Sequence, residues 1–90
     1  MYRIIIASSR VEKELSRIPE PDRGRVVERM KKLAEDPRPK GVRALAPDVY
    51  RLRIGAYRVV YKVYDDEKVV LIGRIARRSE KTYRDFEELF

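Results

Sequence analysis

The sequence predicts an α+β fold in which a helical hairpin packs on a small, mostly antiparallel, twisted sheet. Three observations predict it: an apolar β-branched run near the start, then two amphipathic helical stretches, then three runs of alternating apolar and polar residues. The expected order is β-α-α-β-β-β with a short C-terminal helix. Ninety residues bury only a small core, so we expect one domain over residues 1–90.

The first strand and the start of the first helix are read from residues 2–12. Residues 2–8, YRIIIAS, are rich in β-branched apolar side chains, and this unbroken hydrophobicity predicts a strand buried on both faces. Ser8 or Ser9 suits the N-cap of the helix that follows. Glu12 stands three residues after Ser9, where the acidic partner of a capping box belongs.

Two helices are expected before residue 36. Pro19 and Pro21 end the first helix and start the second, which should span residues 21–35. Each helix has one apolar stripe, and the two stripes predict an antiparallel pair laid on the sheet. The stripes consist of Val11, Leu15 and Ile18 in the first helix and of Val26, Val27, Met30, Leu33 and Ala34 in the second.

The second half of the chain is read as a β-meander. A loop over residues 36–41, DPRPKG, precedes a short apolar piece, VRALA, and a turn at Pro47-Asp48. Three strands should follow, over residues 49–54, 57–64 and 68–77. Beyond them, a final helix capped by Ser79 is expected from the spacing of Phe86, Leu89 and Phe90.

The composition favours some functions and excludes others. With 22 Lys+Arg against 15 Asp+Glu, the net charge of +7 favours a polyanionic partner such as nucleic acid, an acidic protein or an anionic membrane surface. The chain has no Cys and no His, which excludes disulfides, Cys/His zinc sites and Cys or Ser-His nucleophiles. We therefore expect no metal and no other cofactor. The start MYRIII is too short for a signal peptide, and no run approaches the ~20 apolar residues of a membrane span. These features predict a cytoplasmic protein that does not contact membranes.

The block YRLRIGAYRVVY, residues 50–61, predicts a hairpin with one apolar and one cationic face. If Gly55-Ala56 forms a type II′ turn, Arg53 lies directly opposite Arg58. Paired residues share a face of the sheet, so the cationic face consists of Arg51, Arg53, Arg58 and Lys62. The next strand adds Arg77 to this face if the preceding turn has four residues, and Arg74 if it has three.

Two interpretations of this face are open. An arginine-rich chain without Asn or Gln resembles thermophilic proteins, whose half-exposed sheets often carry solvated charges. Such surfaces interleave both signs, however, and residues 49–64 contain no Asp or Glu. Guanidinium groups form bidentate hydrogen bonds with phosphate oxygens and stack on nucleobases. A face that carries only positive charge therefore favours RNA or DNA as its ligand.

The same residues resemble a known family. The segment ALAPDVYRLRIGAYRVVYKVYDDEKVVLIGRIARRSEKTY, with the strand and helical hairpin before it, is similar to toxins of the RelE/ParE superfamily over nearly the whole chain. The resemblance implies a toxin of a type II toxin–antitoxin system. It also implies an acidic, RelB-like antitoxin as partner, with a toxin–antitoxin heterotetramer as one form of assembly.

The resemblance implies two activities within the superfamily. RelE-type members enter the ribosomal A site and cut mRNA, whereas ParE-type members inhibit DNA gyrase and lack the catalytic residues. The tail TYRDFEELF resembles the terminal helix of RelE-type members, so we favour an mRNA interferase that needs the ribosome and mRNA as partners. A ParE-like gyrase inhibitor and a non-catalytic RNA-binding module are the alternatives.

The RelE pattern assigns roles by position. It implies attack of an mRNA 2′-OH on the adjacent phosphate without a metal, with catalytic residues at Arg53, Arg58, Arg77 and Tyr83. Tyr83 is the candidate general base, because neighbouring cations lower the pKa of a phenol, and stacking on an RNA base is its alternative role. The further RNA-binding positions are Arg51, Lys62, Arg74 and Arg78. The best-known bacterial members have lysine at the positions of Arg51 and Arg53, and arginine cannot accept a proton as a neutral amine would.

Overall fold

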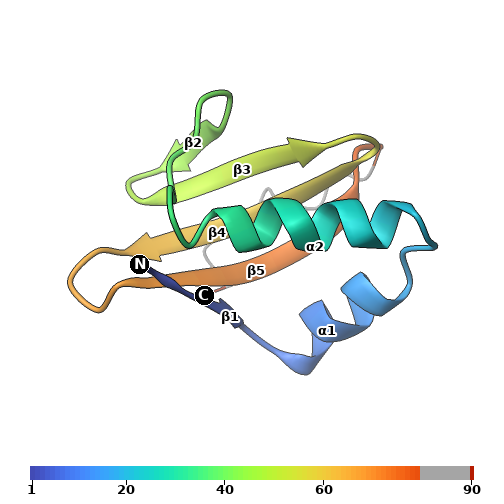
Figure 1. Cartoon of the computed structure of the whole chain (residues 1–90), viewed down its shortest axis with the longest axis horizontal. Coiled ribbons are helices and arrows are strands. Elements are labelled where there is room, and N and C mark those ends of the chain that lie inside the picture. The colour runs from blue at the N-terminus through green and yellow to red at the C-terminus, as the bar shows by residue number, and fades with distance from the viewer. Residues whose placement is uncertain (80–89) are drawn as a thin grey trace.

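The computed structural model describes residues 1–79 and 90, and these residues form two helices on one face of a five-stranded sheet (Figure 1). The helices are α1 (Ser9–Ser16) and α2 (Asp22–Lys32), and the strands are β1 (Arg3–Ile6), β2 (Arg43–Ala46), β3 (Val49–Ile54), β4 (Tyr57–Tyr64) and β5 (Val69–Arg77). The strand order in space is β1-β5-β4-β3-β2, with β1 parallel to β5 and the other neighbours antiparallel. The predicted α+β class and the mostly antiparallel sheet are therefore confirmed.

The core lies between the helices and the apolar faces of the β3–β4 hairpin and of β5, and β5 supplies Val70, Ile72 and Ile75. The hairpin supplies Leu52, Ile54, Tyr57, Val59, Tyr61 and Val63, with Tyr50 half-buried at the margin. The helices and the segments that end them supply Val11, Ile18, Val26, Met30 and Leu33. Because side chains alternate along a strand, the remaining hairpin residues point to the opposite face of the sheet. We call that face, formed by all five strands, the outer face.

The hairpin has the predicted turn and the predicted register. Gly55 has a φ of +58°, and Ala56 is not among the residues with positive φ, as a type II′ turn requires. The strands pair Arg53 with Arg58 and Ile54 with Tyr57. The hydrophobic pattern and the turn agree on this register, and each fixes which side chains reach the outer face.

The first strand and the helix ends differ from expectation. Strand β1 is an edge strand and is not buried on both faces, since Arg3 is exposed and Ile5 is 36% exposed on the outer face. The N-cap of α1 is Ser8, but its side chain makes no capping hydrogen bond, so the predicted capping box does not form. Helix α2 ends at Lys32, before residue 35, although Leu33 still packs in the core.

One strand was missed and one predicted helix is not described. The apolar piece VRALA contains β2, which pairs antiparallel with β3 and places Arg43 opposite Arg51. A four-residue strand beside a proline turn carries too short an alternation to be distinguished from a loop. The C-terminal helix expected from Phe86 and Leu89 lies outside the described residues.

Candidate functional site

The outer face carries two cross-strand rows of arginine. In the first row Arg53 of β3 opposes Arg58 of β4. In the second row Arg51 of β3 lies between Arg43 of β2 and Val60 of β4, and Val60 pairs in turn with Arg74 of β5. The sequence analysis did not place Arg43 on this face, because β2 was not expected.

A bulge in β5 decides which of its arginines joins this face. Tyr64 pairs with Val69, so the turn before β5 has four residues, and unbroken pairing from there would put Arg77 on the outer face. The register shifts between Val60 and Tyr61, because Gly73 is an extra residue in β5. Arg74 therefore lies on the outer face. Arg77 is instead opposite Tyr57, on the face that the helices cover.

The loop-length rule used to assign these two arginines is therefore wrong beyond Gly73. A one-residue bulge reverses the facing of every residue after it, and turn length carries no information about such a bulge. The glycine was the available signal, because an isolated glycine inside a strand pattern often marks a bulge.

The electrostatics of the outer face are of one sign within the strands. None of the residues of β1 to β5 is Asp or Glu, so no strand carboxylate neutralises the arginine rows. Lys62 adds a further cation, and its Nζ lies 5.2 Å from the centroid of the Tyr64 ring. Placing Arg53 opposite Arg58 costs a few tenths of a kcal/mol, roughly, which a bound anion would offset.

A carboxylate reaches the arginines from helix α1, around the edge of the sheet. Strand β1 pairs with β5 only up to Ile72, so β5 has an open edge from Gly73 onward. Arg10 Nη2 donates to the Gly73 carbonyl at 2.9 Å, and the Ile75 N–H donates to Glu14 Oε1 at 2.9 Å. Two side chains of α1 thus occupy backbone positions that a neighbouring strand would otherwise use.

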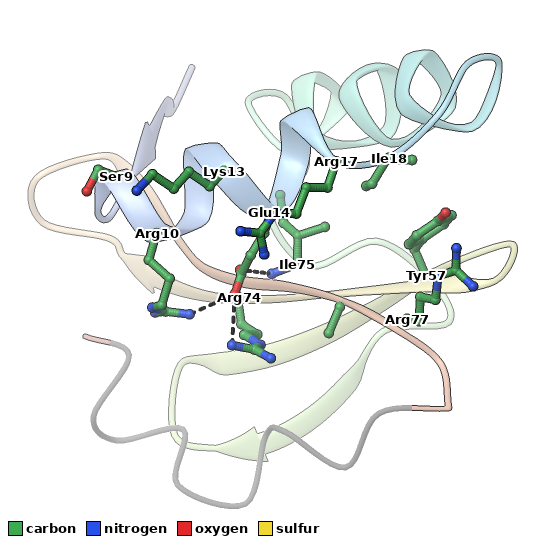
Figure 2. A pocket seen from close by; sticks show the side chains of 11 residues that line it. Ser9, Arg10, Lys13, Glu14, Arg17, Ile18, Tyr57, Arg74, Ile75 and Arg77 are labelled. Carbon is green, nitrogen blue, oxygen red and sulfur yellow. Dashed lines mark hydrogen bonds and ion pairs between the residues drawn. The ribbon is translucent and has the colours of Figure 1, made fainter.

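Glu14 also joins two arginines (Figure 2). Its Oε2 lies 3.0 Å from Arg10 Nη1 and 2.8 Å from Arg74 Nη1, and its side chain is only 12% exposed. The sequence analysis missed this role for Glu14. The i,i+4 spacing of Arg10 and Glu14 was visible, but it predicts an ordinary surface pair on a helix and says nothing of the strand edge.

A second network ties the loop before β2 to the far end of the sheet. Arg38 donates from Nε to the Tyr50 hydroxyl at 2.7 Å, and from Nη2 to Asp48 at 2.8 Å and to Asp65 at 2.9 Å. Tyr2 donates its hydroxyl hydrogen to Asp65 at 2.6 Å. These bonds raise the pKa of Arg38 and hold the network charged.

The same end of the sheet contains a buried phenol. The Tyr61 hydroxyl donates to the Pro37 carbonyl at 2.7 Å, and burial raises the pKa of Tyr61. Tyr61 is therefore a neutral hydrogen-bond donor that fastens the loop, and it does not serve as a proton acceptor.

Asp65 gives the stability of the protein a predictable pH dependence. Hydrogen bonds from Arg38 and then from Tyr2 lower the pKa of the Asp65 carboxyl to about 2. A lowered folded-state pKa contributes stability that is present above the unfolded pKa of about 4 and is lost as the pH falls toward 2. We expect wild type to exceed Asp65→Asn in free energy of unfolding at pH 7, and the difference to shrink between pH 4 and pH 2. Urea unfolding of both proteins across this range checks it, and a pH-independent difference contradicts it.

The other predicted positions are partly outside the described residues. Tyr83 lies among residues 80–89 and cannot be placed in the site. Arg78 is exposed, and its backbone N–H donates to the Ala56 carbonyl at 2.7 Å, which holds the end of β5 against the hairpin turn. In the described part of the chain no helix is long and apolar enough to cross a bilayer, and no three potential metal ligands gather.

Comparison with known proteins gives the chain a set of relatives. Residues 5–82 match the family described as the ParE toxin of type II toxin–antitoxin system, parDE. The chain is 35% identical over 75 residues to a protein of Methanocaldococcus jannaschii named "Putative toxin RelE1", covering 78% of this chain and 83% of that protein.

Solved structures share the fold. The isolated E. coli RelE toxin superposes with a TM-score of 0.78 at 22% identity, covering 98% of this chain and 94% of that one. The toxin fold in the archaeal RelE-RelB complex from Pyrococcus horikoshii OT3 superposes with a TM-score of 0.75 at 30% identity, covering 88% of this chain and 97% of the matched chain. At 22% identity the E. coli match shows the fold alone.

Proposed function

Because the chain belongs to the RelE/ParE superfamily of toxins from type II toxin–antitoxin systems, we propose that it is a ribosome-dependent mRNA endonuclease of the RelE type. The observation that carries the proposal is the outer face, where Arg53 opposes Arg58 and the strands contain no carboxylate. The planar guanidinium groups of these arginines can bind the oxygens of a phosphodiester through two hydrogen bonds each.

The proposed reaction is an internal transfer at one phosphate. The 2′-oxygen of the mRNA forms a bond to the adjacent phosphorus, the bond to the 5′-oxygen breaks, and the products carry a 2′,3′-cyclic phosphate and a 5′-OH. Arg53 and Arg58 stabilise the negative charge that builds on the phosphoryl oxygens. Arg51 orients the RNA backbone. Tyr83 accepts the 2′-OH proton, and a proton is delivered to the departing 5′-oxygen.

Arg77 and Arg74 have different parts in this proposal. Arg77 ends β5, is exposed, and follows Ala76, the partner of Arg58, so its long side chain can reach the reacting phosphate around the end of the strand. Arg74 shares the outer face with Arg58, but Glu14 holds its guanidinium. It therefore suits a role in holding the RNA backbone rather than in the chemical step.

Kinetics of two variants test this division. Arg77→Ala should lower kcat by roughly 100-fold, because it removes charge stabilisation present in the transition state. Arg74→Ala should chiefly raise KM. The initial rate of mRNA cleavage is measured at fixed toxin concentration as the concentration of mRNA-programmed ribosomes is varied, which gives kcat and KM separately. The reverse pattern would move the chemical role to Arg74.

The function itself is tested by the products. Primer extension on mRNA incubated with ribosomes and toxin should show new ends inside codons, and polynucleotide kinase should label these ends without prior phosphatase treatment because they carry a 5′-OH. Intact mRNA with ribosomes present would refute the proposal.

Gyrase inhibition is the second candidate, because the matching family is described as a ParE toxin. A supercoiling assay with purified gyrase separates the two, since inhibition without mRNA cleavage identifies the ParE type. Neither activity would leave a non-catalytic RNA-binding module. For the partner we propose a cognate acidic antitoxin, in keeping with the RelE-RelB complexes among the similar structures and with the charge of +7.

A further inference from the structure

A pocket of about 610 Å³ lies between α1 and the open edge of β5, beside the outer face (Figure 2). Among the residues that line it, five are cationic and one, Glu14, is a carboxylate. Lys13 of α1 and Arg17, which caps its C-terminal end, are four residues apart, and Arg77 of β5 also lines the pocket. Within the described residues, the side chains of these three make no ion pair.

The pocket and the outer face are joined by an arginine. Arg74 has its Cα in the outer-face row with Val60, yet its side chain lines the pocket and reaches Glu14. Arg77 lines the same pocket at the end of β5. A chain of cations therefore runs from Arg51 on the outer face around the edge of β5 to Lys13 and Arg17. A polyanion that follows this path meets several cations in succession, with the uncharged Val60 between Arg51 and Arg74.

The chemistry of the pocket favours phosphate over a peptide. A peptide that adds a strand needs free backbone groups, but Arg10 and Glu14 already occupy the Gly73 carbonyl and the Ile75 N–H. An amphipathic helix needs exposed apolar anchors. The apolar residues of the lining are already buried, with Ile18, Tyr57 and Ile75 only 3%, 6% and 3% exposed. The pocket therefore offers a ligand five cationic side chains and no large exposed apolar residue.

We propose that this pocket is a second phosphate-binding site for RNA, which takes the sugar-phosphate backbone next to the nucleotides held on the outer face. The proposal rests on the proposed function for the placement of the RNA on the outer face, and it adds Lys13 and Arg17, which the cleavage mechanism does not use. The phosphates come from the messenger or from ribosomal RNA, and both present the same chemistry.

Salt dependence of binding tests the site. Lys13→Ala/Arg17→Ala removes two pocket cations, and Lys31→Ala/Lys40→Ala removes the same charge from exposed positions outside the pocket. Binding of a short labelled oligouridylate is followed by fluorescence anisotropy at several salt concentrations. Each lost phosphate contact lowers the slope of log K against log[salt] by ~0.7 for a single strand. If two contacts are lost, raising the salt from 50 to 200 mM should weaken binding by the pocket variant by a factor that is about sevenfold smaller than the factor for wild type.

A second arm distinguishes the source of the phosphate. Co-sedimentation with ribosomes is measured for the same proteins, with thermal melts to verify folding. Weaker oligouridylate binding of the pocket variant identifies the messenger, and a loss confined to ribosomes identifies ribosomal RNA. Unchanged RNA binding in both arms overturns the proposal, as does an equal loss in the Lys31/Lys40 control. Loss of antitoxin binding alone would make the pocket a protein site and would also overturn it.

The outcome is independent of cleavage. Binding to oligouridylate is measured without ribosomes and needs no chemical step. If the pocket variant shows the smaller salt slope but wild type never cuts mRNA, the phosphate site stands and the nuclease proposal fails. If wild type cuts mRNA but the pocket variant shows neither a changed slope nor weaker ribosome binding, the nuclease proposal stands and the phosphate site fails.

Discussion

Arg58→Ala is expected to lower mRNA cleavage on the ribosome by roughly 100-fold to 1000-fold, the usual loss when one preorganised charge donor is removed from a transition state. Arg58 is half-buried near the start of the central strand β4 and lies opposite Arg53, so both side chains project from the outer face. Its position on a rigid strand makes the loss one of geometry as well as charge.

Two controls interpret that loss. Arg58→Lys keeps the charge but not the planar fork, so its activity should fall between wild type and the alanine variant. Arg29→Ala removes the same charge from the exposed side of α2 and should leave cleavage near the wild-type value. Cleavage by Arg58→Ala at the wild-type rate, in a protein with an unchanged melting curve, would remove the arginine pair from the reaction.

Arg38→Ala is expected to lower the free energy of unfolding by about 2 kcal/mol, the size of a lost set of charge-assisted hydrogen bonds that are partly exposed to solvent. The guanidinium links Asp48 and Tyr50 at the start of β3 to Asp65 after β4, and Arg38 itself lies in a third segment, before β2. In a 90-residue protein this loss corresponds to roughly 10 °C in Tm.

The control for Arg38 lies in the same loop. Lys40 is exposed, and its side chain makes no hydrogen bond or ion pair with the residues that the structure describes, so Lys40→Ala should change the free energy of unfolding by less than about 0.5 kcal/mol. Arg38→Lys should recover part of the stability, because an ammonium cannot reach three acceptors at once. Thermal and urea unfolding by circular dichroism measure all three variants. Equal stability of Arg38→Ala and wild type would show that the network is dispensable.

The hairpin could be predicted from the sequence because two independent signals agree in it. The alternation of apolar and polar residues predicts which face is buried, and the Gly55-Ala56 turn predicts the strand register. Together they place Arg53 opposite Arg58, as the structure has it. Helix α2 was predicted for a similar reason, since its apolar stripe and the preceding proline point to the same start.

The position of Arg77 could not be predicted, because it depends on one residue. The alternation of β5 continues on both sides of the bulge at Gly73. The bulge only reverses which face of the sheet the residues after it point to. Glu14 was missed for another reason. Glu14 reaches the Ile75 N–H because the pairing of β1 with β5 ends at Ile72, which leaves the edge of β5 open from Gly73. The spacing of residues within α1 does not predict where that pairing ends.

The pairing of β1 with β5 also has a consequence for the order in which the protein is made. Strand β1 is the first of the five to leave the ribosome and β5 is the last, yet β5 is the only strand that β1 pairs with in the described residues. Both Arg74 and Arg77 lie on β5 as well. Long-range pairing of this kind forms late, because the loop must close before its contacts contribute. A nascent chain therefore completes neither its sheet nor its cationic edge until β5 has emerged.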